Sequence, residues 1–115
     1  MEVKIKSYIG ENCITVDDGE RLYQKIHSEI LTGHRVDIDF SGVNIFASPF
    51  FNAAIGQLLK DLPREQLKSL LHFIGLSSHG DHVLRRVIEN AQKYYTNPHF
   101  RESVEKVLAH QAQDI

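Results

Sequence analysis

Two aspartates and a serine stand at positions in this chain where they could do chemistry. Asp37 and Asp39 alternate with apolar residues in the run VDIDF, and Ser48 stands immediately before Pro49. An Asp-x-Asp pair on a strand can supply a nucleophile and an acid, or hold Mg²⁺. A serine at the start of a helix either caps that helix or accepts a phosphate group that the helix dipole stabilises.

The aspartate pair is open to two interpretations. It superficially matches phosphatases of the haloacid-dehalogenase type, which makes a small Mg-dependent phosphohydrolase that uses Asp37 and Asp39 the alternative function. The rest of that enzyme pattern does not follow in the sequence. We therefore favour a structural role, in which both carboxylates lie on the polar face of a strand opposite Lys4 and Lys6.

Other catalytic and metal-binding patterns are missing from the sequence. His79 and His82 lie one helical turn apart, but no cysteine or third histidine follows at a recognisable ligand spacing. Cys13 is the single cysteine, and no serine stands in a G-x-S-x-G motif. We predict that the protein is not an enzyme and that it has no cofactor and no metal site.

Length and charge limit the function classes further. A chain of 115 residues with 13 basic and 15 acidic side chains is long enough for one domain and offers no basic surface for nucleic acid. The first residues lack the apolar core of a signal peptide, and no apolar run is long enough to cross a membrane. We expect a cytoplasmic protein that binds neither nucleic acid nor membrane.

Apolar periodicity predicts the elements that position these residues. Period-2 patterns indicate strands, at 3–6, 13–16, 36–40 and 70–74. Helical spacing and capping signals indicate helices, from Asp17 or Asp18 to Gly33, at 49–62, from Ser78 or Asp81 onward, and at 97–112. Strands that alternate with helices favour an α/β layer structure with a partly parallel sheet.

The run VDIDFSGVNIFASPFFNAAIGQLL resembles the core of STAS domains, the fold of the anti-sigma factor antagonists. It is most similar to the STAS-like bacterial domains of unknown function, in which an acidic strand end, a Gly-Val turn and a helix-opening serine follow one another. The resemblance covers roughly residues 10–95. It implies a single STAS-like domain over 1–115, with a mixed four-to-five-stranded sheet, about four helices and 97–112 as an added C-terminal helix.

The resemblance also implies a function. STAS antagonists are small regulatory modules that bind a protein partner, here a serine kinase or an ATPase of the histidine-kinase-like type. In them a serine at the start of this helix is phosphorylated, within Asp-Ser-Ser/Thr-Gly, where this chain has Ala47-Ser48-Pro49-Phe50.

By this resemblance Ser48 is a phosphosite, and the alternative is a purely structural N-cap. The implied partner surface comprises Asp39, Ser41, Phe50 and Asn52. Phe50 is either an exposed docking anchor or a packed core residue, because it lies about 100° around the helix from Phe51. A structural homodimer formed through the C-terminal helix is a further alternative.

Overall fold

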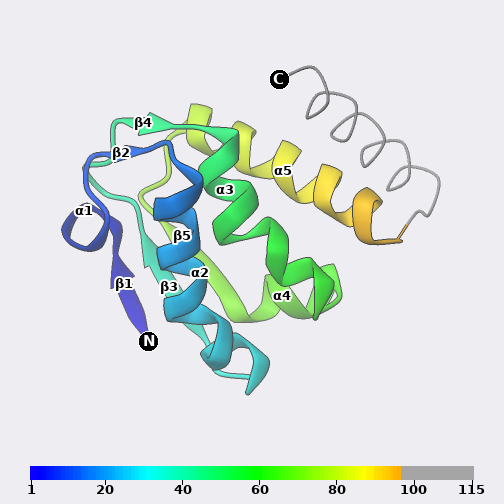
Figure 1. The fold of residues 1–115 in the computed structure, drawn as a ribbon. Coiled ribbons are helices and arrows are strands. Elements are labelled where there is room, and N and C mark those ends of the chain that lie inside the picture. Colours follow the sequence, from blue (N-terminus) through cyan, green and yellow to red (C-terminus); the bar gives the residue numbers. More distant parts are fainter. Residues whose placement is uncertain (97–115) are drawn as a thin grey trace.

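The computed structural model describes residues 1–96, and it is an α/β structure of short parallel strands and helices (Figure 1). The strands are β1 (Glu2–Lys4), β2 (Asn12–Cys13), β3 (Val36–Asp39), β4 (Ile45–Phe46) and β5 (Leu71–Ile74). The helices are α1 (Ile5–Tyr8), α2 (Val16–Leu31), α3 (Ser48–Ala54), α4 (Arg64–Leu70) and α5 (Ser78–Thr96), with a 3-10 helix η1 (Gly56–Lys60). The helix predicted at 97–112 lies outside the described residues.

The strands form two sheets, where the sequence predicted one. A three-stranded sheet has the order β1-β3-β5, and β2 pairs with β4 in a separate two-stranded sheet. Every strand pairing within residues 1–96 is parallel, so the prediction of a mixed sheet is wrong for this part of the chain, although the predicted α/β class is confirmed. The division arises because β1 ends at Lys4 and the chain turns at once into α1, which separates β2 from the larger sheet.

The three-stranded sheet is apolar on one face and polar on the other. Val3, Ile38 and Phe73 lie side by side across it and face the core. The opposite face carries exposed and half-buried side chains in two rows, Glu2-Asp37-His72 and Lys4-Asp39-Ile74. The predicted alternation of the 36–40 strand is therefore confirmed, and we call its polar side the open face.

The first long helix begins slightly earlier than its sequence signals predicted. Its N-cap is Thr15, whose hydroxyl oxygen accepts a hydrogen bond from the backbone N–H of Asp18 at 3.1 Å, so the predicted caps at Asp17 and Asp18 are wrong. Both aspartates lie in the first turn, where the helix dipole favours negative charge. The predicted end at Gly33 is confirmed by its φ of 83°, a conformation that glycine adopts without a side-chain clash.

The helix predicted at 49–62 is divided in the structure. α3 ends at Ala54, and the chain tightens into η1, which begins at Gly56. A Cβ atom at position 56 would lie 3.4 Å from the Cβ of Ala91, so α5 approaches the backbone closely at this point. Glycine permits that approach but is a poor helix former.

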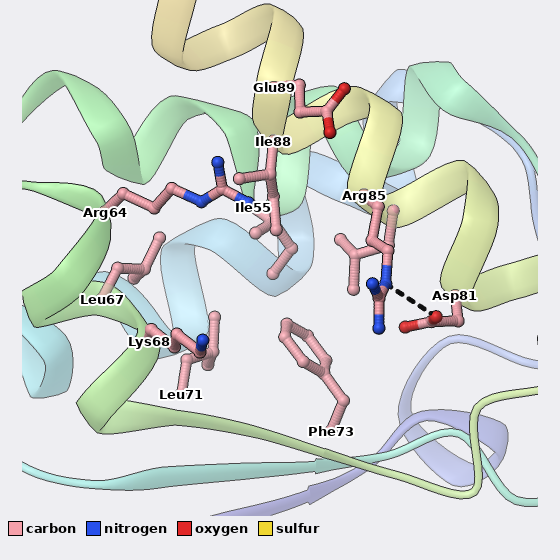
Figure 2. A pocket seen from close by; sticks show the side chains of 11 residues that line it. Ile55, Arg64, Leu67, Lys68, Leu71, Phe73, Asp81, Arg85, Ile88 and Glu89 are labelled. Atoms are coloured by element: carbon pink, nitrogen blue, oxygen red, sulfur yellow. Dashed lines mark ion pairs between the residues drawn. The ribbon is translucent and has the colours of Figure 1, made fainter.

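The sequence did not predict two of the helices, α1 and α4. The prediction of a strand at 3–6 is wrong after Lys4, because Ile5 and Lys6 belong to α1. For α4, Pro63 indicates the end of the preceding helix but not the start of another. With β5 and α5, helix α4 surrounds a cavity of about 300 Å³, which Figure 2 shows in detail.

Candidate functional site

Ser48 lies at the first residue of α3 with its side chain exposed to solvent. The N-cap of this helix is Ala47, and no side chain makes a capping hydrogen bond there. The expectation that Ser48 caps the helix is therefore wrong by one position. Pro49 is in the first turn, as predicted. A backbone N–H in the first turn has no carbonyl partner within the helix, so proline, which lacks this N–H, removes no hydrogen bond there. The Ser48 hydroxyl makes no hydrogen bond within residues 1–96, so the structure gives it no capping role.

The small sheet supports this helix start. The backbone N–H of Ala47 donates to the carbonyl oxygen of Cys13 at 2.9 Å, and that of Asn44 donates to Glu11 at 2.8 Å. Cys13 and Phe46 point inward from β2 and β4, and both are buried. Since side chains alternate along a strand, the neighbouring residues Ile14 and Ile45 point outward. Backbone hydrogen bonds thus hold the segment directly before Ser48, and the exposed side chains of Ile14 and Ile45 lie on the two segments that these bonds join.

Exposed apolar side chains gather on the segments that flank Ser48. Ile14 is 42% exposed, Ile45 is 48% exposed and Val16, at the start of α2, is 52% exposed. Asn52 is also exposed and lies four residues after Ser48, which places both on one side of α3. We define the Ser48 surface by its members, Ile14, Val16, Ile45, Ser48, Pro49 and Asn52.

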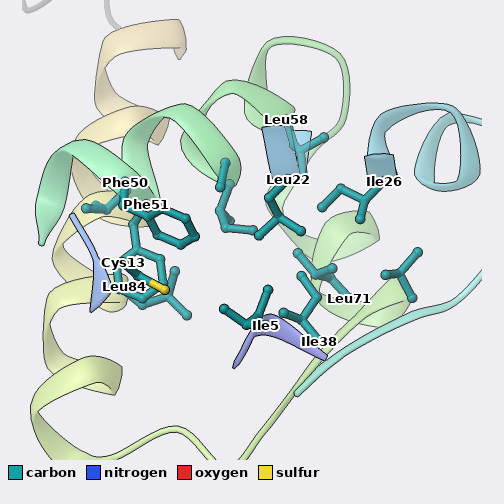
Figure 3. Close-up of a cluster of buried hydrophobic side chains, with 14 of the residues drawn as sticks. Ile5, Cys13, Leu22, Ile26, Ile38, Phe50, Phe51, Leu58, Leu71 and Leu84 are labelled. Carbon is teal, nitrogen blue, oxygen red and sulfur yellow. The ribbon is translucent and has the colours of Figure 1, made fainter. Parts of the chain in front are cut away.

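Phe50 is not part of any surface. Its side chain is fully buried, and its ring packs edge-on against Phe51 with the ring centres 5.6 Å apart. Figure 3 shows both rings within the core, beside Cys13 and Leu84. Of the two interpretations of Phe50, the docking anchor is wrong and the packed core residue is confirmed. The helix that carries Phe50, α3, lies between α2 and α5 and contacts both (Figure 1).

Asp39 and Ser41 lie at the carboxyl end of β3, on and beside the open face. The carboxylate of Asp39 accepts a hydrogen bond from the backbone N–H of Ser41 at 2.9 Å. Hydrogen bonds from the side chain and the backbone of Ser41, with a smaller contribution from the charge of Lys4, lower the pKa of Asp39. No hydrogen bond or ion pair in the described part of the chain joins Asp39 or Ser41 to Ser48. Of the four residues predicted as one partner surface, Phe50 is buried in the core, Asp39 and Ser41 lie at the carboxyl end of β3, and Asn52 is exposed on α3.

Asp37 is held in a separate contact. Its carboxylate accepts a hydrogen bond from Nε of Arg35 at 2.9 Å, and its register partner on β1 is Glu2. Lys4 lies opposite Asp39 in the register of β1 and β3, as the structural interpretation of the aspartates expected. Lys6 instead forms an ion pair with Glu11, in which Nζ lies 3.8 Å from Oε1. Among residues 1–96, no three side chains capable of binding a metal come together.

The residues that sequence reasoning missed are Ile14, Val16 and Ile45. Each is apolar, and none of them belongs to the partner surface predicted from the sequence. Ile45 lies beside the buried Phe46 in the two-residue strand β4, and Ile14 follows directly after the buried Cys13 at the end of β2. The strands are too short for a period-2 pattern to show which member faces solvent.

None of the described helices is of a length and apolarity that would let it cross a membrane. A comparison with protein families matches residues 18–81, more than half of the chain, to a STAS-like domain of unknown function. The matched region runs from α2 to the start of α5 and contains Ser48. Neither the comparison with curated proteins nor the comparison with solved structures gave a match. The chain thus belongs to the family of STAS-like domains of unknown function (DUF4325).

Proposed function

We propose that this protein is a regulatory module that acts in the bacterial cytoplasm by binding a protein partner through the Ser48 surface. The observation that carries the proposal is that three exposed apolar side chains lie on the paired segments next to an exposed serine, and that this serine makes no hydrogen bond within residues 1–96. Grouped exposed apolar side chains are typical of protein-binding surfaces, whereas isolated ones are common everywhere. The resemblance to anti-sigma factor antagonists suggests a serine kinase or an ATPase of the histidine-kinase-like type as the partner.

Phosphorylation of Ser48 is the proposed control. The hydroxyl is accessible to a kinase, and no member of the Ser48 surface is charged. A phosphate group adds close to two negative charges. Placed among Ile14, Ile45 and Pro49, it would have to be desolvated when a partner covers the surface, so it would weaken an apolar interface.

The test compares two exposed isoleucines. A tagged full chain captures partners from the native cell, and each captured protein is then purified and titrated by calorimetry. We expect Ile45→Asp to weaken binding at least tenfold. Ile74→Asp is the matched control, because Ile74 is 44% exposed but lies on the open face. Equal affinities for Ile45→Asp and wild type would move the interface away from the Ser48 surface.

Ser48→Asp tests the proposed control separately. Its carboxylate places negative charge at position 48, and we expect weaker partner binding with an unchanged melting temperature. If Ser48→Asp binds as wild type does while Ile45→Asp fails to bind, the surface is correct and the phosphorylation proposal is wrong. Sedimentation of Ile45→Asp beside wild type shows whether the partner is a second copy of this chain.

The proposal involves no catalysis. The phosphohydrolase alternative needs both aspartates to act on one substrate, but Asp37 binds Arg35 and Asp39 binds Ser41. Purified protein is assayed for Mg²⁺-dependent hydrolysis of a generic phosphomonoester. Turnover that disappears in Asp39→Asn would contradict a purely binding role.

A further inference from the structure

A concave site lies away from the Ser48 surface and shares no residue with it. It is the cavity of about 300 Å³ between α4, β5 and α5, beside β5, which is the edge strand of the three-stranded sheet within residues 1–96. Its volume is at the lower end of the ~300–1,000 Å³ typical of small-molecule sites. The cavity is therefore large enough for a compact organic ligand.

The floor of this cavity is apolar and held in place by the core. Leu67, Leu71 and Leu84 are buried beneath it, and the ring of Phe73 rises from β5 into it (Figure 2). Ile55 and Ile88 complete the apolar lining. Because these side chains belong to the main core cluster or pack against it, the cavity is formed before any ligand arrives. Such a floor suits a hydrocarbon or aromatic body.

The rim of the cavity carries more positive than negative groups. Its cations are Arg64, Lys68 and Arg85, and its carboxylates are Asp81 and Glu89. Arg85 is already paired, with its Nε 2.9 Å from the Asp81 carboxylate.

The two cationic side chains on α4, Arg64 and Lys68, differ in their partners. Arg64 donates a hydrogen bond to the neutral side chain of Gln92 at 3.1 Å, and Lys68 has no ion pair within residues 1–96. Figure 2 shows Lys68 and Glu89 on opposite sides of the cavity, so the α4 side is the positive one.

We propose that this cavity binds a small amphipathic anion, with its apolar body over Phe73 and its acidic head beside Arg64 and Lys68. The head is a carboxylate or a phosphate monoester, since both accept hydrogen bonds from guanidinium and ammonium groups. An uncharged ligand of the same shape would leave both cations without an anionic partner, and a cationic one would be repelled. This inference does not rest on Ser48, and the two sites are tested independently.

Four probes with one hydrocarbon chain and different heads test the head group. The full chain is titrated with octanoate, octyl phosphate, 1-octanol and octylammonium while amide chemical shifts are recorded by NMR. We expect both anions to bind, with the largest shifts at Leu67, Phe73 and Ile88, and octylammonium to bind at least tenfold more weakly. Tighter binding of octanoate or of octyl phosphate identifies the acidic head of the ligand as a carboxylate or as a phosphate monoester. Equal binding of anionic and cationic probes, or binding of neither anion, would overturn the proposal.

Three variants test the location. Lys68→Gln is expected to weaken octanoate binding roughly two- to fivefold, the range for one partly exposed charge pair. Arg86→Gln is the matched control, because Arg86 is exposed on α5 but does not line the cavity.

Ile88→Trp should fill the cavity and abolish binding of both anions. Each variant is first shown to melt as wild type does, so that loss of binding is not loss of folding. An effect of Arg86→Gln as large as that of Lys68→Gln, or unchanged binding in Ile88→Trp, would place the ligand elsewhere.

Discussion

Gly19 in α2 lies directly against the backbone carbonyl of Phe50 in α3. A Cβ atom at position 19 would stand 2.5 Å from that oxygen and 2.7 Å from the Cβ of Ala53. Glycine within a helix costs about 1 kcal/mol relative to alanine, so its presence here reflects the close approach of two helices. This contact holds α3 on the core and thereby positions Ser48 at the surface.

Gly19→Ala should destabilise the protein by about 1–3 kcal/mol, because the added methyl group meets backbone that cannot move aside freely. In an exposed helix the same substitution would be stabilising, so the sign of the change is the test. Ser28→Ala, at an exposed position of α2, is the control and should leave stability almost unchanged. Urea denaturation measures both variants. A stabilised Gly19→Ala would mean that α2 and α3 are further apart than the structure shows.

The start of α2 has a side-chain capping hydrogen bond and the start of α3 has none, so the two can be compared in a capping experiment. Thr15→Ala removes the oxygen that accepts from Asp18 and should cost about 1 kcal/mol. Ser48→Ala removes no capping bond, and its effect should stay within about 0.5 kcal/mol. Thermal unfolding of both variants separates the predictions. A cost at Ser48 equal to that at Thr15 would restore the capping role.

These contacts show how far sequence reasoning reached. The strand at Val36–Asp39 and the helix that opens at Ser78 were predicted because their apolar spacing reflects one buried face. The sequence does not determine the burial of Phe50, because that burial depends on two other helices that flank α3. The division of the strands into two sheets likewise depends on tertiary pairing, which local spacing does not encode.

In the candidate site, too, the features that depend on local sequence could be predicted and those that depend on tertiary pairing could not. Ser48 was identified from the chain because a serine before a proline is a local signal. Ile14 and Ile45 were missed because their exposure results from the pairing of β2 with β4, segments that are far apart in the sequence. The cavity was missed because its wall, α4, was not predicted.

Cys13 should be unreactive in the folded protein. Burial, with a smaller contribution from the negative charge of Asp18, raises the pKa of its thiol to about 12. Since the thiolate is the reactive form, alkylation by iodoacetamide at pH 8 should be more than tenfold slower than in the denatured chain. The double variant Cys13→Ala, Asn12→Cys moves the thiol to the exposed neighbouring position and should react at the rate of a free thiol. Equal rates in the two folded proteins would show that β2 opens readily.

Asp39 should make stability depend on pH in the acid range. Its pKa is lowered in the folded state, so the unfolded chain takes up a proton first as the pH falls. Its stabilising contribution is therefore complete above the ordinary aspartate pKa of about 3.9 and is lost as the pH falls through the lower folded value. Asp39→Asn should lack this part of the pH dependence in denaturation measured between neutral and acid pH.

Ser41→Ala tests the cause of the lowered pKa. It removes the side-chain hydrogen bond to the Asp39 carboxylate, the largest contribution, while the backbone N–H of residue 41 still donates. The pKa of Asp39, followed by NMR titration of its carboxyl carbon, should therefore move only part of the way back toward its ordinary value. Ser28→Ala, on the distant helix α2, is the matched control and should leave that pKa unchanged. If the pKa of Asp39 in Ser41→Ala equals that in wild type, the backbone donor and Lys4 cause the whole lowering. If the pKa of Asp39 returns completely to its ordinary value, the backbone hydrogen bond from residue 41 is lost together with the hydroxyl.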